Sequence, residues 1–152
     1  MIETAVPNGY DAVTPYLVVK DASAAIAFYQ NAFGAAEQMR LVVSSGAVVH
    51  AQVQIGGSFL MITEDNPELG NHSPQSPHGS SGHLHLYVAN VDEVFSRALA
   101  AGAKSLIPVD DPFYGDRSGR LIDPFGHIWI IATRKQEMSR DAMQRRLDAA
   151  LK

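Results

Sequence analysis

The chain repeats a pattern of strands and helices at an interval of 69 residues, and this duplication limits its fold more than any other feature. Residues 13–21 and 83–90 are rich in β-branched and aromatic residues and end in Asp or Asn, so each segment predicts a strand that enters a turn. Gly57 and Gly126 stand before the last predicted strand of each half, again 69 positions apart (126 − 57). The repeat indicates two copies of one supersecondary unit.

A helical pattern of apolar residues follows the first strand of each half. In residues 22–35 the apolar side chains recur at helical spacing, and Gly34 is placed to end the helix. In residues 91–103 the same spacing returns, with Asp92 able to cap the start and Gly102 able to end the helix. Two matching helices therefore occupy equivalent places in the repeat.

Three further strands complete each half. Turn-forming residues separate them, and they cover residues 37–44, 47–55, 58–64, 104–109, 119–123 and 127–133. The sequence therefore predicts an α+β fold of two βαβββ modules. A single module exposes one face of its curved sheet, so pairing two modules around a pseudo-twofold buries the seam and leaves a concave cleft between the sheets. We expect function to reside in that cleft.

The repeat also divides the chain. Module one covers about residues 11–64 and module two about 83–134, which makes residues 1–134 a single domain. Residues 65–82, between the modules, are rich in Pro, Gly, Ser and Asn and predict a linker. Residues 135–152 begin as a polar stretch and end in a helical pattern, which predicts a C-terminal helical extension.

Composition excludes several classes of protein. The chain has 152 residues, 46% of them hydrophobic, yet no apolar run approaches the ~20 residues of a membrane span. Without cysteine there is no disulfide scaffold and no thiolate metal site, so any metal must bind through His, Asp or Glu. A net charge of −4 without a basic face argues against nucleic acid as a partner. The N-terminus lacks the basic and then apolar pattern of a signal peptide, so we expect a cytoplasmic protein.

Strand alternation predicts which side chains line the cleft. In the strand at 47–55 the apolar positions suit the face covered by the helix, which sends the polar positions to the opposite face: His50, Gln52 and Gln54. By the same alternation the first strands of the two modules contribute Thr14, Tyr16, His83, His85 and Tyr87. Polar and aromatic groups therefore line the predicted cleft.

The glycine-rich segment 108–120 predicts a loop beside this cleft. Tyr114 and Arg117 could close one end of the cleft and bind an anionic or carbonyl group, because a guanidinium offers paired donors in a fixed arrangement. The structural alternative is an ion pair that only pins the turn, either Asp116 with Arg117 or Arg120 with Asp123. Both roles stay open for Arg117, whereas the structural one is preferred for Arg120.

Residues 13–35, 84–103 and 113–133 together resemble the vicinal oxygen chelate superfamily, which includes glyoxalase I, bleomycin-resistance proteins and extradiol dioxygenases. The resemblance extends over about residues 11–134 and is strongest to the PhnB-like branch. It implies paired βαβββ modules, a cleft between them and a homodimer. It does not imply one reaction, because this scaffold hosts several chemistries as well as non-catalytic binders.

The resemblance also implies where metal ligands would stand. Metal-dependent members place one ligand on the first and one on the last strand of each module, and the matching positions here are Thr14, Met61, His83 and Ile130. Only His83 is a usual ligand, so we expect no metal and no other cofactor. The alternatives are a metal-dependent lyase, isomerase or dioxygenase that uses His83, His85 and His50, and a metal-free enzyme in which a cleft histidine acts as general base.

The sequence therefore predicts a protein that binds a small organic ligand in the cleft without a metal. The ligand-binding residues we expect are Tyr16, His50, Gln52, His83, His85, Tyr114 and Arg117. A homodimer is expected, partly through the C-terminal helix. That helix can be capped by Ser139 and carries a narrow apolar stripe of Met143, Leu147 and Leu151.

Overall fold

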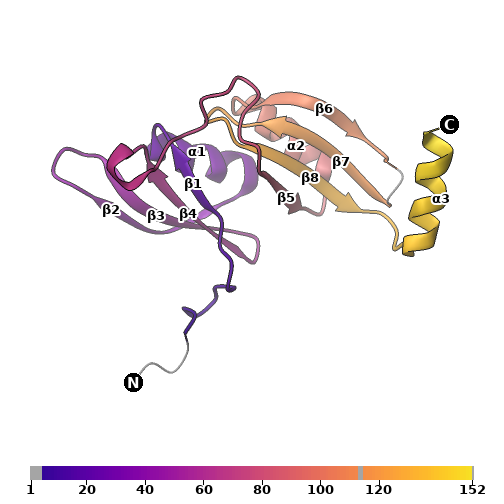
Figure 1. Cartoon of the computed structure of the whole chain (residues 1–152), viewed down its shortest axis with the longest axis horizontal. Coiled ribbons are helices and arrows are strands. Elements are labelled where there is room, and N and C mark those ends of the chain that lie inside the picture. Colours follow the sequence, from indigo (N-terminus) through magenta and orange to yellow (C-terminus); the bar gives the residue numbers. More distant parts are fainter. Residues whose placement is uncertain (1–4, 113–114, 152) are drawn as a thin grey trace. The chain divides into compact units, whose positions relative to one another are not determined.

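The computed structural model describes residues 5–112 and 115–151. The chain divides into two compact units, Met1–His78 and Gly79–Lys152. Each unit contains one four-stranded sheet with one helix packed on it (Figure 1). The predicted α+β fold of two βαβββ modules is confirmed.

Module one consists of five elements in the order predicted. They are β1 (Tyr16–Val19), α1 (Ala22–Phe33), β2 (Ala36–Val42), β3 (Val48–Ile55) and β4 (Ser58–Glu64). The strand order across the sheet is β1-β4-β3-β2, with β1 parallel to β4 and the other pairs antiparallel. The first strand of the module therefore pairs with its last, and α1 makes the crossover that leads away from β1.

Module two repeats this arrangement. Its elements are β5 (His83–Tyr87), α2 (Val91–Ala100), β6 (Lys104–Asp110), β7 (Asp116–Ile122) and β8 (Ile128–Arg134). The strand order is β5-β8-β7-β6, again with the first strand parallel to the last. Between β4 and β5 the chain forms one short turn of 3₁₀ helix, Pro67–Leu69, inside the segment predicted as a linker.

The ends of α1 and α2 follow from local chemistry. Asp21 caps α1, since its side chain accepts a hydrogen bond from the Ala24 amide at 3.0 Å, and Gly34 ends the helix in the left-handed conformation, as predicted. The prediction that Asp92 caps α2 is wrong. Asn90 is the N-cap instead, accepting from the Glu93 amide at 3.2 Å. Asp92 lies inside the first turn, where its carboxylate is available to another partner.

The last strand of each module also anchors the start of its helix. The Ala22 amide donates to the Glu64 carboxylate at 2.9 Å, and the Val91 amide donates to the Thr133 hydroxyl at 2.9 Å. These two donors are 69 residues apart (91 − 22), and so are the two acceptors (133 − 64). The duplication is therefore preserved at the level of single hydrogen bonds, although the acceptors differ chemically.

The core of each module lies between the helix and one face of its sheet. In module one the fully buried side chains include Val19, Ile26, Tyr29, Val53 and Ile62. In module two they include Val91, Ala98, Leu121 and Ile131. The opposite face of each sheet has no helix of its own module on it, and we call it the open face.

The segment predicted as a loop at 108–120 is partly strand. β7 begins at Asp116 and not at Gly119. Asp, Ser and Gly have low strand propensity, but backbone pairing with β8 holds them in the strand here. β6 is irregular, because its pairing with β7 shifts register twice. The second shift lies at Pro108 and Val109, and it follows from a proline that has no N–H to donate to the ladder.

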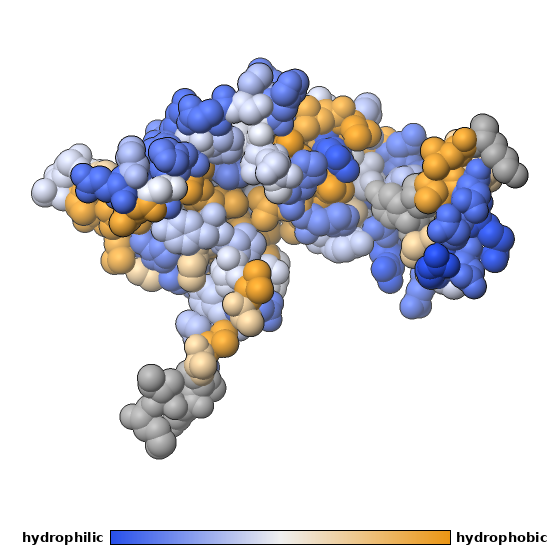
Figure 2. Space-filling view, viewed as in Figure 1, coloured by the Kyte–Doolittle hydropathy of each residue, from blue (hydrophilic) through white to orange (hydrophobic). Residues whose placement is uncertain are grey.

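α3 (Arg140–Ala150) follows β8, and Ser139 caps it as predicted, accepting from the Ala142 amide at 3.1 Å. The helix contains no buried residue, and Leu151 just beyond it is 78% exposed. Figure 2 shows apolar surface next to strongly polar surface on this helix. Among residues 5–112 and 115–151, no helix has the length and apolar character needed to cross a membrane.

Candidate functional site

Polar and aromatic side chains of module one collect on its open face. Tyr16, Met61, Gln52 and Met39 are register partners across the four strands and therefore form one row on one face of the sheet. Ala51, Val53 and Ile55 are buried on the other face, against the helix. The predicted alternation along β3 is therefore confirmed, and His50 lies on the open face beside Gln52.

A line of hydrogen bonds fixes these polar groups. The Tyr10 hydroxyl donates to Gln52 Oε1, and the Gln52 Nε2 group lies 3.0 Å from His50 Nε2. Because the carboxamide oxygen accepts from Tyr10, its NH₂ group donates to the histidine, whose Nε2 is the acceptor. The Tyr16 ring lies next in line, with its centroid 6.3 Å from that of His50.

Tyr10 is a site residue that the sequence did not predict. It lies just before the predicted start of module one, and its ring stacks on Phe59 of β4 with the centroids 4.3 Å apart and the planes at 18°. Burial raises the pKa of the Tyr10 hydroxyl, so the group stays a hydrogen-bond donor. The one sequence signal was the Pro7-Asn8-Gly9 turn, which directs the chain back onto the sheet through a hydrogen bond from the Tyr10 amide to the Pro7 carbonyl.

The open face of module two carries an equivalent row. His85, Ile130, Arg120 and Ile107 are register partners from β5 to β6. His83 and Tyr87 share the face of His85, because alternate residues of a strand point to the same side. The rings of His85 and Tyr87 are 4.7 Å apart. The predicted positions of His83 and His85 on one face are therefore present within module two.

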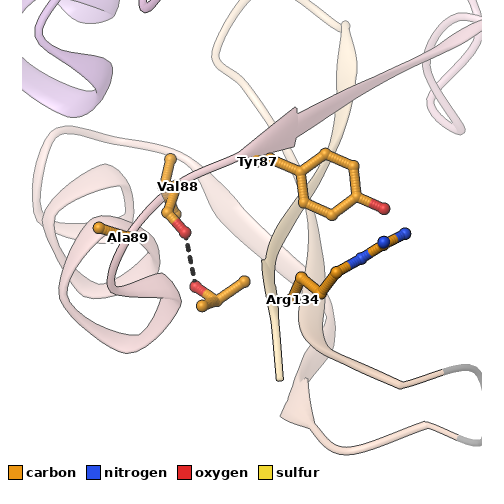
Figure 3. Close-up of a pocket in the computed structure, with 5 residues that line it drawn as sticks. Tyr87, Val88, Ala89 and Arg134 are labelled. Carbon is orange, nitrogen blue, oxygen red and sulfur yellow. Dashed lines mark hydrogen bonds between the residues drawn. The ribbon is translucent and has the colours of Figure 1, made fainter. Parts of the chain in front are cut away.

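Tyr87 also belongs to a polar cluster at the end of the parallel strands. Its hydroxyl donates to the buried Asp116 carboxylate at 2.8 Å, while Arg134 Nε lies 4.0 Å from the second oxygen of that carboxylate. The hydrogen bond to Asp116 and partial burial raise the pKa of Tyr87. Tyr87, Val88, Ala89, Thr133 and Arg134 line a shallow pocket of about 540 Å³. In Figure 3 the Tyr87 ring and the Arg134 side chain lie next to each other.

Arg117 lies on the helix-covered face of module two and not on the open face. It pairs with Thr133 of β8, and its guanidinium binds both carboxylate oxygens of Asp92 at 2.9 and 3.0 Å and that of Asp111 at 3.0 Å. These ion pairs raise the pKa of Arg117 and lower that of Asp92. These contacts support the structural role for Arg117, in which its ion-pair partners are Asp92 and Asp111 and not Asp116.

Two further residues of the segment 108–120 need separate mention. Tyr114 lies outside the described residues. Asp123 does not serve Arg120 as a turn-pinning partner, because its carboxylate accepts from Trp129 Nε1 at 3.0 Å and from the amides of Phe125 and His127. Arg120 instead lines a cavity of about 230 Å³ on the open face, together with Ile107, Ser118 and Ile130.

The donor set does not fit a catalytic metal of the kind that the resemblance implies. Met61 and Ile130 occupy the centres of the two sheets, where their side chains are a thioether and a hydrocarbon. Such groups do not bind the divalent ions that imidazole and carboxylate ligands hold. Within the described parts of the chain, no group of three or more His, Cys, Asp or Glu residues is arranged to hold a metal ion.

Comparison with known proteins identifies the family. The model of the Glyoxalase/Bleomycin resistance protein/Dioxygenase superfamily matches residues 9–131. An uncharacterized protein of Mycobacterium tuberculosis is 39% identical in an alignment of 145 positions that covers 93% of this chain and 85% of the relative. The match begins just before Tyr10 and extends into β8, so it includes both modules.

Solved structures agree with this assignment. A glyoxalase-related enzyme from Fulvimarina pelagi is 27% identical, with a TM-score of 0.65 over 82% of this chain and 88% of that one. The PhnB protein from Bacillus cereus shares the fold at 21% identity, with a TM-score of 0.65 over 81% of this chain and 99% of that one. The chain therefore belongs to the Glyoxalase/Bleomycin resistance protein/Dioxygenase superfamily.

Proposed function

We propose that this protein binds a small organic molecule on the open faces of its sheets without a metal, as a sequestering or resistance-type binder of the PhnB-like branch. The observation that carries the proposal is the hydrogen-bonded line from Tyr10 through Gln52 to His50. A polar array held in one arrangement on an open sheet face resembles the few fixed polar groups that orient a ligand in a binding site.

The surroundings of this line suit an organic ligand. Phe59 and Tyr16 offer aromatic faces for stacking, and Met61 offers a polarizable surface that adapts to the shape of a ligand. No carboxylate belongs to the row of Tyr16, Met61, Gln52 and Met39. This composition favours an uncharged or weakly anionic ligand over a cation.

Binding is tested by a thermal-shift screen of small organic compounds, followed by calorimetric titration of each hit. We expect Gln52→Leu, which removes the amide at nearly constant volume, to weaken binding at least tenfold. Gln54→Leu is the matched control, because Gln54 lies on the same strand and bonds to Gln38 on the neighbouring strand, outside the line. Affinities that change equally in the two variants would contradict the placement of the site.

Metal content gives a second test. The protein is purified without chelator and without nickel affinity resin and analysed by elemental mass spectrometry. We expect far less than one equivalent of Zn, Mn, Fe or Ni, because Thr14, Met61 and Ile130 supply no strong ligand. One bound equivalent that is lost in His83→Ala would falsify the metal-free proposal and favour the metal-dependent alternative.

A further inference from the structure

Arg120 is a partly buried cation on the open face of module two that forms no ion pair with the described residues. Its Nε atom is buried and has no hydrogen-bond partner, and no carboxylate of residues 5–112 or 115–151 forms an ion pair with its guanidinium. Arg117, three positions earlier, has two carboxylate partners. A buried charge is ordinarily paired, so the unpaired donor of Arg120 indicates a missing anionic partner.

The irregular edge of β6 creates a cavity in front of this side chain. Between the register pairs Ile107–Arg120 and Asp110–Ser118, β6 advances three residues while β7 advances two, so one extra residue on β6 forms a bulge. The bulge includes Pro108, and the resulting cavity of about 230 Å³ is lined by Ile107, Pro108, Asp110, Pro112, Ser118, Gly119, Arg120 and Ile130.

Module one lacks this arrangement at the equivalent place. Gln52 there occupies the position of Arg120, since each is the neighbour in register of the central residue of its sheet, Met61 or Ile130. Both edge strands have an extra residue on one side of this position, Gln38 in β2 and Leu106 in β6, but on the other side the extra residue of module one lies on β3, at Val49, and not on the edge strand. Gln52 is also already bonded to Tyr10 and His50. The duplication therefore does not require the Arg120 cavity, which is particular to module two.

The walls of the cavity limit the chemistry of its occupant. Ile107 and Ile130 flank Arg120 in register and offer aliphatic surface. Asp110 also lines the cavity, and its Oδ1 accepts from the Asp111 amide at 2.8 Å. A second negative charge on the occupant would be repelled by Asp110. The cavity is smaller than a usual pocket for a whole ligand and suits one end of a molecule.

We infer that Arg120 forms a subsite for the carboxylate of a small organic acid with a short aliphatic part. The planar guanidinium pairs with the planar carboxylate through parallel N–H···O bonds, which satisfy the buried Nε donor, while the aliphatic part contacts Ile107 and Ile130. This inference rests on the proposed function, because it treats the open faces as ligand-binding surfaces, and it specifies the acidic end of the ligand.

The test is a ¹H–¹⁵N NMR titration of the full-length protein with 3-methylbutanoate. The Nε–H signal of Arg120 is assigned by its loss in Arg120→Lys. We expect this signal to shift saturably, the neutral isostere 3-methylbutanamide to bind at least tenfold more weakly, and Arg120→Gln to weaken binding of the acid at least tenfold. Arg97→Gln is the control, because Arg97 is an exposed arginine of α2, which covers the other face of the sheet, and it should retain affinity within twofold.

Several results would overturn the subsite. The first is no shift of the Arg120 Nε–H signal up to about 50 mM acid, a concentration well above the millimolar dissociation constant that seven non-hydrogen atoms can supply. The others are equal binding of acid and amide, and tighter binding of methylphosphonate. If Arg120→Gln does not fold, the signal in the unmodified protein still decides. Library hits that depend on Gln52 and leave Arg120 unperturbed refute the subsite alone, whereas a carboxylate bound at Arg120 with hits insensitive to Gln52→Leu refutes the module-one placement alone.

Discussion

At the scale of single residues, the contact between Tyr87 and Asp116 links acid–base behaviour to stability. The phenol donates to a buried carboxylate at 2.8 Å, and this bond is retained only while Tyr87 keeps its proton. The hydrogen bond and burial raise the pKa of Tyr87 above its ordinary value near 10. In the unfolded chain Tyr87 no longer contacts the Asp116 carboxylate, so it ionises at its ordinary pKa.

We predict a characteristic pH dependence for Tyr87→Phe. Below about pH 10 Tyr87 keeps its proton in both states, and its contribution to the unfolding free energy is complete. Above about pH 10 the unfolded chain binds fewer protons than the folded one, so this contribution falls as pH rises through the folded pKa. Urea unfolding of both proteins from pH 8 to 11 measures the difference, because all other ionising groups cancel. A difference that is constant over this range would contradict the prediction, and Asp116→Asn should remove most of its pH dependence.

Arg117 and Arg120 show what the sequence could and could not predict about the site. Residues separated by an odd number of positions point to opposite faces of a strand, so these two arginines cannot share a surface once β7 is known to include both. The sequence predicts a strand that begins only at Gly119, because Asp, Ser and Gly have low strand propensity. Without the true start of β7, the alternation could not be applied, and the arginine of the open face was misidentified. His50, Gln52, His83 and His85 were correctly assigned to their faces because burial alternates strictly along residues 50–55 and 83–87.

At the scale of elements, the bond between the last strand and the helix start holds each module together. In module two, Thr133 accepts from the Val91 amide at 2.9 Å and donates to the Val88 carbonyl at 2.8 Å. Its hydroxyl therefore ties β8 to both ends of the turn between β5 and α2. A valine has nearly the same shape but cannot form either bond.

We therefore predict that Thr133→Val lowers the unfolding free energy by about 1–3 kcal/mol, the cost of leaving a partly buried amide without its acceptor. Thr133→Ser is the matched control, because it keeps the hydroxyl, and it should lose less than half as much. Chemical denaturation of the three proteins measures both effects. Equal losses in the two variants would show that the methyl group of Thr133, and not its hydrogen bonds, stabilises this junction.

Packing of α2 on β7 depends on the absence of a side chain at Gly119. A Cβ atom there would lie 2.8 Å from Phe95 Cε2 and 2.9 Å from Val109 Cγ2, both too close for contact. We predict that Gly119→Ala destabilises the protein by about 1–3 kcal/mol through overpacking. In thermal or urea unfolding, Phe95→Leu should recover part of this loss, giving a favourable coupling of about 1 kcal/mol in the double variant. Strict additivity of the two losses would contradict the proposed clash.

The order and type of the elements could be predicted from the sequence, because the 69-residue repeat and the apolar spacing are strong signals. The cap of α2 could not be chosen between Asn90 and Asp92, since both are good capping residues near the same turn. The bulge in β6 also could not be predicted from the sequence. It depends on how Pro108 meets β7, which is a property of the paired strands and not of the segment itself.

At the scale of the whole molecule, the exposure of α3 is the basis of a prediction about the oligomeric state. Met143, Leu147 and Leu151 recur at helical spacing, yet no residue of the helix is buried within this chain. We expect a homodimer of about 32.8 kDa (2 × 16.4 kDa) by light scattering. A chain that ends at Lys135 should dissociate at higher concentration than the full chain. A monomeric full chain contradicts the dimer, and an unchanged dimer after truncation contradicts only the role of α3.

The pairing of the first strand of each module with its last has a consequence during protein synthesis. β4 ends at Glu64 and β8 ends at Arg134, so the ribosome adds 70 residues (134 − 64) between completing the strands of the first sheet and those of the second. At ~5–20 residues per second, this takes roughly 4–14 s. The β2–β3 and β3–β4 hairpins form in microseconds, so β4 is in place for β1 to pair with it before β8 exists. The two similar modules therefore form their sheets at different times during synthesis, which protects them from exchanging strands with each other.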